Sequence, residues 1–141
     1  MARLYTAEAT AYGPRTGAVI SSDDRLDLEL SRPVEMGGEG GDGTNPEQLF
    51  AAGYAACFHS AMRHAVADQR LGPESLTGAH VTARVHFDKA GPREFDLAVD
   101  LLVHLPRIPR EQAEAVVEAT HQICPYSRAT RGNVAVSLQV V

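Results

Sequence analysis

One continuous stretch, residues 44–69, constrains the fold of this chain more than any other. Pro46 suits the first position of a helix, where its missing N–H costs nothing. A Leu-Gly-Pro sequence follows the stretch as a stop signal, so we expect one long helix ending at about Gln69. A capping box at its start has two possible registers, Asn45 with Gln48 or Thr44 with Glu47.

The first half of this helix is apolar on nearly every side. Residues 49–62 contain few polar side chains, so we expect this part to be buried on most faces. Small residues leave little side-chain bulk, so that another backbone can approach closely: Ala51, Ala52, Gly53, Ala55 and Ala56.

Short strands and a second helix account for most of the remaining chain. Alternating apolar and polar residues predict strands at residues 4–12, 18–21, 26–30, 81–87, 95–105 and 133–141. The tight turns between them predict an antiparallel meander for the first three strands and a hairpin for the fourth and fifth. Helical spacing of apolar residues predicts a helix at residues 110–122. The pattern indicates an α+β fold with about six strands in antiparallel sheets and two main helices. The length of 141 residues predicts a single domain, residues 1–141.

Composition narrows the possible partners. The net charge of −5 argues against nucleic acid as a partner, because phosphates demand a basic surface. The sequence has no signal-peptide pattern and no apolar run of about 18–20 residues, so we expect no membrane association and a cytoplasmic location. Two cysteines in a cytoplasmic chain do not make a secretory disulfide framework.

The two cysteines have different surroundings. Cys57 lies about three turns into the long helix, where the helix dipole no longer lowers a thiol pKa, so its activation requires a cation. Pro125 disfavours helical geometry at Cys124 and can begin a new short helix with Cys124 at its cap, a typical setting for an activated thiol. Each cysteine is therefore a structural thiol, a reactive thiol or half of a redox pair.

A metal site is not expected. Cys57 and His59 are two residues apart on a helix and point in different directions, and the chain has no HExxH motif or paired CxxC. His121 lies three residues before Cys124, and we interpret it as a last-turn histidine that faces the end of its helix.

Two stretches carry a family resemblance. Residues 44–58 and residues 124–133 resemble the two signatures of the organic hydroperoxide resistance (Ohr) subfamily of the Ohr/OsmC family. The similarity extends over residues 4–140, and Pro14 departs from it, because family members usually have glycine before the arginine. The resemblance implies an OsmC-like fold in an intertwined homodimer.

The resemblance also implies a thiol peroxidase. By this likeness Cys57 attacks the hydroperoxide and becomes a sulfenic acid, and Cys124 resolves it as a disulfide. Arg15 matches the family's arginine, which stabilises the thiolate and polarises the peroxide, and Glu47 matches the glutamate that orients it. These roles make Cys57 the reactive thiol, whereas the neighbouring residues alone predict that Cys124 is the better activated of the two.

The implied activity is the reduction of alkyl and fatty-acid hydroperoxides to alcohols, with no bound cofactor. An external dithiol, dihydrolipoamide or a lipoylated protein, would reduce the disulfide again. The alternatives are an OsmC-type peroxidase with a different peroxide preference and a redox sensor that uses the same disulfide without turnover. An apolar site wall would favour organic peroxides, and its candidates are Leu49, Phe50, Phe58 and Met62.

Helix geometry favours a site shared between two chains. Glu47 and Cys57 are ten residues apart, which is about 15 Å along a straight helix. An arginine held by Glu47 would then not reach Cys57 of the same chain. The hypothesis is that Arg15 and Glu47 serve Cys57 of the partner chain in a homodimer.

Overall fold

A computed structural model describes all residues of the chain, 1–141. The chain divides into two compact units, Met1–Leu49 and Phe50–Val141, and each is described by itself. The helix α1 (Pro46–Asp68) begins in the first unit and belongs mostly to the second. The single domain expected from the chain length stays a prediction.

The first unit contains a three-stranded antiparallel sheet. Its strands follow one another in the order β1 (Ala9–Tyr12), β2 (Ala18–Ser21) and β3 (Asp27–Glu29), and a short 3₁₀ helix, η1 (Val34–Met36), follows them. The predicted meander is thus confirmed, but its first strand begins at Ala9 and not at residue 4. The reason is that β2 has only four residues, and its last residue, Ser21, pairs with Ala9.

This first unit has almost no core in the single chain. Leu30 is its only buried hydrophobic residue, and no side chain of β1, β2 or β3 is fully buried. Large apolar side chains of this unit are exposed instead: Met1, Leu4, Tyr5, Tyr12, Leu26 and Val34. A three-stranded sheet normally needs an apolar face packed against another element to be stable, and the single chain does not supply it.

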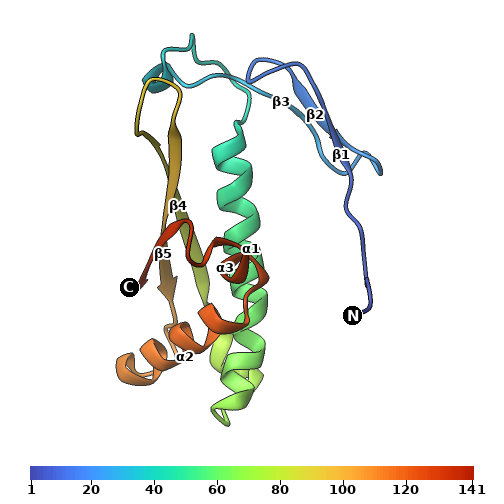
Figure 1. Cartoon of the computed structure of the whole chain (residues 1–141). Helices are drawn as coiled ribbons and strands as arrows, with labels where there is room; N and C mark the ends of the chain where they lie inside the picture. Colours follow the sequence, from blue (N-terminus) through green and yellow to red (C-terminus); the bar gives the residue numbers. More distant parts are fainter. The chain divides into compact units, whose positions relative to one another are not determined.

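The second unit contains the larger sheet and its helices (Figure 1). After α1 and a short 3₁₀ helix come a β-hairpin, two helices and a last strand. Their bounds are η2 (Pro73–Leu76), β4 (His80–Lys89), β5 (Phe95–His104), α2 (Arg110–Ile123), α3 (Pro125–Thr130) and β6 (Ala135–Val140).

The prediction of antiparallel sheets is wrong for β6. The sheet order is β4-β5-β6, and β6 pairs with β5 in parallel, from Ala98 with Ala135 to Val103 with Val140. Parallel neighbours need a long crossover connection between them, and α2 with α3 forms that crossover. The predicted hairpin of β4 and β5 is confirmed.

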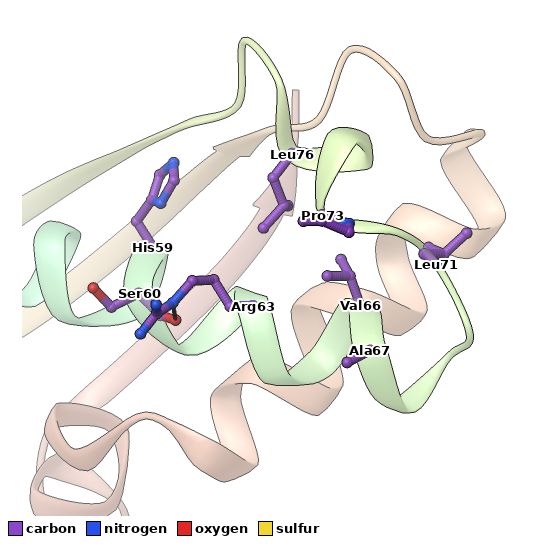
Figure 2. A pocket seen from close by; sticks show the side chains of 8 residues that line it. All are labelled: His59, Ser60, Arg63, Val66, Ala67, Leu71, Pro73 and Leu76. Carbon is purple, nitrogen blue, oxygen red and sulfur yellow. Dashed lines mark hydrogen bonds between the residues drawn. The ribbon is translucent and has the colours of Figure 1, made fainter.

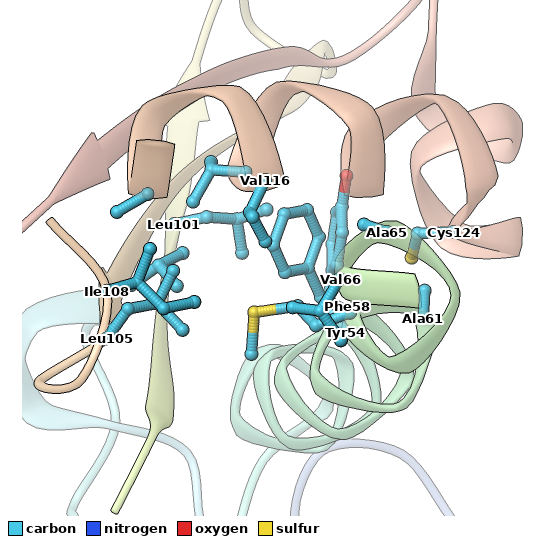
Figure 3. Packing of buried hydrophobic residues seen from close by; sticks show 14 of the residues in the cluster. Tyr54, Phe58, Ala61, Ala65, Val66, Leu101, Leu105, Ile108, Val116 and Cys124 are labelled. Atoms are coloured by element: carbon cyan, nitrogen blue, oxygen red, sulfur yellow. The ribbon is translucent and has the colours of Figure 1, made fainter. Parts of the chain in front are cut away.

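The core of the second unit lies between the inner face of its sheet and the helices (Figure 3). The central strand β5 contributes Val99, Leu101 and Val103, all essentially without exposure. From α2 the side chains of Val116 and Val117 join them, and α2 also contacts β6. From α1 the buried residues recur at helical spacing: Tyr54, Phe58, Ala61, Met62, Ala65 and Val66.

The burial of α1 differs from the prediction in one respect. Only one face of the helix is buried, and Ala52, Ala56 and Ser60 are exposed at four-residue intervals on another. Within the single chain only one face of α1 is covered by other elements. The face of α1 that carries these small residues is therefore open to solvent. No helix of the structure, α1 included, has the length and apolar character needed to cross a membrane.

Two neighbouring leucines of β5 test this packing. Leu101 is fully buried and Leu102 is partly exposed on the opposite face. We expect Leu101→Ala to lower the free energy of unfolding by about 2–5 kcal/mol, because it leaves a cavity in the core. Leu102→Ala should cost about 1 kcal/mol or less. Urea unfolding at one fixed protein concentration measures both, and equal losses would contradict the assigned faces of β5.

Candidate active site

The two cysteines lie together in the second unit. The Sγ atoms of Cys57 on α1 and Cys124 after α2 are 3.7 Å apart, and both thiols are free. A disulfide bond has an S–S distance of about 2.05 Å, so a small movement closes it. Cys57 is partly exposed, whereas Cys124 is completely buried. The structure therefore brings the two cysteine stretches together, as a disulfide between them requires. Solvent can reach Cys57 but not Cys124.

The position of Cys124 follows from the proline after it. Helix α2 ends at Ile123, Cys124 takes an extended conformation with ψ of 123°, and Pro125 begins α3. The Cys124 N–H still donates to the carbonyl oxygen of Thr120, 2.8 Å away, so the cysteine stays attached to the last turn of α2. The predicted helix boundary and the predicted short helix are both confirmed.

The surroundings of Cys57 oppose its ionisation. Burial raises the pKa of the Cys57 thiol, the neighbouring Cys124 raises it further, and a hydrogen bond from the backbone N–H of Tyr126 acts in the other direction. The net direction is upward, as expected for a thiol in an apolar setting. A reactive thiolate at Cys57 therefore requires positive charge in addition to the Tyr126 amide.

Tyr126 is a site residue that the sequence analysis missed. Its ring lies 6.0 Å from that of Phe50 and 5.6 Å from that of Tyr54, measured between centroids. Gly53 permits this approach, because a Cβ there would lie 2.7 Å from the Tyr126 hydroxyl oxygen. The available signal was the position of Tyr126 directly after the Cys-Pro pair, which directs it towards the helix that carries Cys57.

The first unit contains the predicted arginine–glutamate pair. Both terminal nitrogens of Arg15 donate to Glu47, each at 2.7 Å, in the bidentate geometry expected for a guanidinium and a carboxylate. The side chain of Glu47 is only 15% exposed and that of Arg15 31% exposed. The hydrogen bonds from Arg15 lower the pKa of Glu47, and those to Glu47 raise the pKa of Arg15.

Backbone pairing brings these two residues together. A turn closed by the Gly17 N–H and the Pro14 carbonyl carries Arg15 between β1 and β2. A side chain at Gly17 would overlap the carbonyl oxygen at the end of β1, so the tight turn requires glycine. The Leu30 N–H donates to the Gly17 carbonyl, and Leu30 forms a parallel bridge with Thr44. The turn and the start of α1 thus lie on either side of Leu30.

The start of α1 only partly follows the predicted capping box. The Asn45 side chain accepts a hydrogen bond from the Gln48 N–H at 2.8 Å, which makes Asn45 the N-cap. The Gln48 side chain does not return to Asn45, and it accepts instead from the Thr44 hydroxyl at 2.8 Å. Glu47 is left to bind Arg15.

The prediction of an apolar wall at the active site is wrong for two of its four candidate residues. Phe58 and Met62 have no exposed surface and belong to the core of the second unit. They fall on the face of α1 that packs against the sheet. Leu49 and Phe50 are half-buried, and Phe50 contacts the Tyr126 ring.

His59 and His121 each form a hydrogen bond within the protein. His59 Nε2 is 3.1 Å from the Ala79 carbonyl oxygen, and His121 Nδ1 is 2.8 Å from the Ser127 hydroxyl. His121 therefore bonds a side chain of α3, which the sequence interpretation did not include. No group of three or more His, Cys, Asp or Glu side chains is placed to hold a metal ion.

A separate hollow of about 570 Å³ lies along the second half of α1 (Figure 2). Neither cysteine lines it. Its lining is formed by His59, Ser60, Arg63, Val66, Ala67, Leu71, Pro73 and Leu76.

Comparison with known proteins identifies the family to which the chain belongs. A family model described as "OsmC-like protein" matches residues 38–139. An organic hydroperoxide resistance protein from Xanthomonas axonopodis pv. citri is 47% identical over 138 residues, which cover 96% of this chain and 93% of that protein. The chain belongs to the Ohr/OsmC family.

Other Ohr/OsmC proteins agree over the whole length. The organic hydroperoxide resistance protein OhrB from Bacillus subtilis is 43% identical, covering 97% of this chain and 98% of its own. A crystal structure of an organic hydroperoxide resistance protein from Legionella pneumophila, 47% identical, superposes with a TM-score of 0.90 over 99% of this chain and 98% of the other. The OsmC-like α+β fold is thereby confirmed.

The Arg15–Glu47 pair predicts a pH effect. Because Arg15 lowers the Glu47 pKa, the pair stabilises the folded state above the unfolded pKa of glutamic acid, and this contribution is lost as pH falls through the folded pKa. In an Arg15→Met variant we expect the Glu47 pKa to rise, since burial then acts without its partner. NMR titration of the labelled carboxyl measures it. Arg25→Met, which removes the exposed partner of Asp23, is the matched control, and an unchanged Glu47 pKa in Arg15→Met would contradict the assignment.

Proposed function

We propose that this chain is a thiol peroxidase that reduces organic hydroperoxides to alcohols. The 3.7 Å separation of the Cys57 and Cys124 sulfur atoms carries the proposal, because it places two free thiols one small movement from a disulfide. Relatives named for organic hydroperoxide resistance support a role in organic hydroperoxide detoxification and favour this class of substrate.

The exposure of the two cysteines supports different roles for their sulfur atoms. Cys57 is partly open to solvent, so a peroxide can reach it, whereas Cys124 has no exposed surface. In the first step the Cys57 thiolate attacks the terminal oxygen of the hydroperoxide. The O–O bond breaks, Cys57 becomes a sulfenic acid, and the alkoxide takes a proton and leaves as the alcohol. Burial of Cys124 supports its role as the resolving thiol.

In the second step Cys124 attacks the sulfenic sulfur of Cys57. The S–S bond forms, and the sulfenic hydroxyl leaves as water with the proton of the Cys124 thiol. An external dithiol then reduces the disulfide by thiol–disulfide exchange. Dihydrolipoamide or a lipoylated protein is the proposed reductant, and no bound cofactor takes part in these steps.

Arg15 supplies the missing positive charge in this proposal. Burial raises the Cys57 pKa, so a guanidinium beside the sulfur would restore the thiolate and polarise the peroxide. The bidentate contact with Glu47 fixes the direction in which Arg15 points. We retain the hypothesis that Arg15 and Glu47 act on Cys57 of the partner chain in a homodimer.

Two observations support a homodimer. The β1–β3 sheet lacks an apolar core in the single chain, and α1 exposes the small residues Ala52, Ala56 and Ser60 along one face. A second copy would cover apolar surface on both. The cytoplasmic location also stays a prediction.

A turnover assay tests the chemistry. With cumene hydroperoxide and dihydrolipoamide we expect Cys57→Ser to lower kcat/KM by more than about 100-fold, because the nucleophile is lost. Cys124→Ser should still reduce one equivalent of peroxide and then accumulate a sulfenic acid that dimedone traps. Thr82→Ala, on the exposed face of β4, serves as a control.

The assay also separates the alternatives. Oxidation of Cys57 by one equivalent of peroxide, without further turnover in the wild type, would favour a redox sensor. A clear preference for hydrogen peroxide over cumene hydroperoxide would favour an OsmC-type peroxidase of different substrate preference.

Mixed dimers test the shared site. A Cys57→Ala chain retains Arg15 and Glu47, and an Arg15→Ala, Glu47→Ala chain retains Cys57. If the sites are shared, a dimer of the two has one intact site, and we expect about half the wild-type activity from dimers purified with two tags. As a control, the triple variant that also carries Cys57→Ala should give no activity with either chain. Inactive mixed dimers would rule out sharing.

A further inference from the structure

Three helices meet at one buried hydroxyl group, that of Ser127. The Ser127 Oγ atom on α3 is 2.9 Å from the hydroxyl of Tyr54 on α1 and 2.8 Å from Nδ1 of His121 on α2. Ser127 and Tyr54 have no exposed surface. The Tyr54 hydroxyl also lies 3.3 Å from Oγ1 of Thr130, at the end of α3.

Residues of this network lie three positions from each cysteine in the chain. Tyr54 lies three residues before Cys57 on α1, which is close to one helical turn. His121 lies three residues before Cys124, and Ser127 lies three residues after it. Hydrogen bonds at the Ser127 hydroxyl thus join α1, α2 and α3, and each of the three residues lies about one helical turn from a cysteine.

The rest of α3 has few other attachments to the helices. It contains six residues, and Pro125 provides no N–H of its own. Arg131, just after α3, donates to the His121 carbonyl oxygen at 2.6 Å, which ties the end of α3 back to α2. Helix α3 is linked to α1 by the Tyr54 hydroxyl, by contact of the Tyr126 ring and by the hydrogen bond from the Tyr126 N–H to Cys57.

We propose that Ser127, Tyr54 and His121 are positioning residues that hold Cys124 against Cys57 for disulfide formation. This inference rests on the proposed function. The step they serve joins the Cys124 sulfur to the sulfenic sulfur of Cys57 and releases water, with no additional oxidant. None of these hydrogen bonds involves a sulfur atom, so the network acts through the position of α3 and not on the peroxide.

A purely structural role would give a different pattern. A buried hydroxyl that only satisfies its neighbours contributes to folding, and its loss lowers stability wherever it lies. Thr120 provides that comparison, because its fully buried hydroxyl donates to the Val116 carbonyl of its own helix, at 2.7 Å, and has no part in the network. Thr120→Val is therefore a matched control for Ser127→Ala.

The first measurement is the equilibrium of the Cys57–Cys124 disulfide with a dithiothreitol redox buffer, which requires no peroxide. In Ser127→Ala we expect the equilibrium constant for disulfide formation to fall about tenfold, which raises the reduction potential by about 30 mV. Tyr54→Phe removes the hydrogen bonds to Ser127 and Thr130 but leaves the one between His121 and Ser127, so it should shift the equilibrium in the same direction by less. Thr120→Val should leave it unchanged.

The second measurement follows one equivalent of cumene hydroperoxide by rapid quench and mass spectrometry. We expect Ser127→Ala to form the Cys57 sulfenic acid at the wild-type rate and to convert it to the disulfide about tenfold more slowly. A second equivalent should then give more sulfinic acid at Cys57 than in the wild type.

The outcomes are distinct for the inference and for the function. An unchanged disulfide equilibrium in Ser127→Ala and Tyr54→Phe, or an equal shift in Thr120→Val, would overturn the positioning role. Failure of the wild type to turn over would overturn the proposed function, while the disulfide equilibrium would still decide the positioning role. If Ser127→Ala does not fold, Tyr54→Phe provides the same decision.

Discussion

The interruption of the helical chain at Cys124 is the constraint on which the candidate site depends. Pro125 prevents α2 from continuing, so the backbone extends at Cys124 and turns into α3. That turn brings the Cys124 sulfur to 3.7 Å from Cys57 and aims the Tyr126 N–H at the Cys57 sulfur. The absence of a side chain at Gly53 completes the arrangement, since the Tyr126 ring passes directly over that position of α1.

Electrostatics divides the candidate machinery into two parts. The second unit holds two thiols in an apolar setting that raises the Cys57 pKa, and the first unit holds a guanidinium whose direction is fixed by a carboxylate. In the proposed mechanism, the reactive thiolate needs both parts. The small core of the first unit and the open face of α1 leave apolar surface that a second copy would cover in the proposed homodimer.

Local signals in the sequence predicted most elements and the cysteine stretches. The boundaries of α1, the end of α2 and the β4–β5 hairpin follow from caps, prolines and alternation, which act over a few residues. The parallel pairing of β6 was missed because it depends on a crossover through two helices, although a helix between two strands is itself a signal for it. Phe58 and Met62 were predicted to line the site because α1 is apolar on nearly every side. Its sequence therefore does not show which face packs against the sheet. The Ser127 network joins residues up to 73 positions apart, and no local pattern reveals it.

The complete burial of Cys124 has a consequence for the return half of the proposed cycle. In a disulfide between the two cysteines, the Cys57 sulfur is the one that an incoming thiolate can approach. The mixed disulfide with the reductant then forms on α1, and the Cys124 thiolate is the leaving group. The same cysteine therefore receives the oxidant in its thiolate form and the reductant in its disulfide form, so the two substrates approach one sulfur atom in alternation.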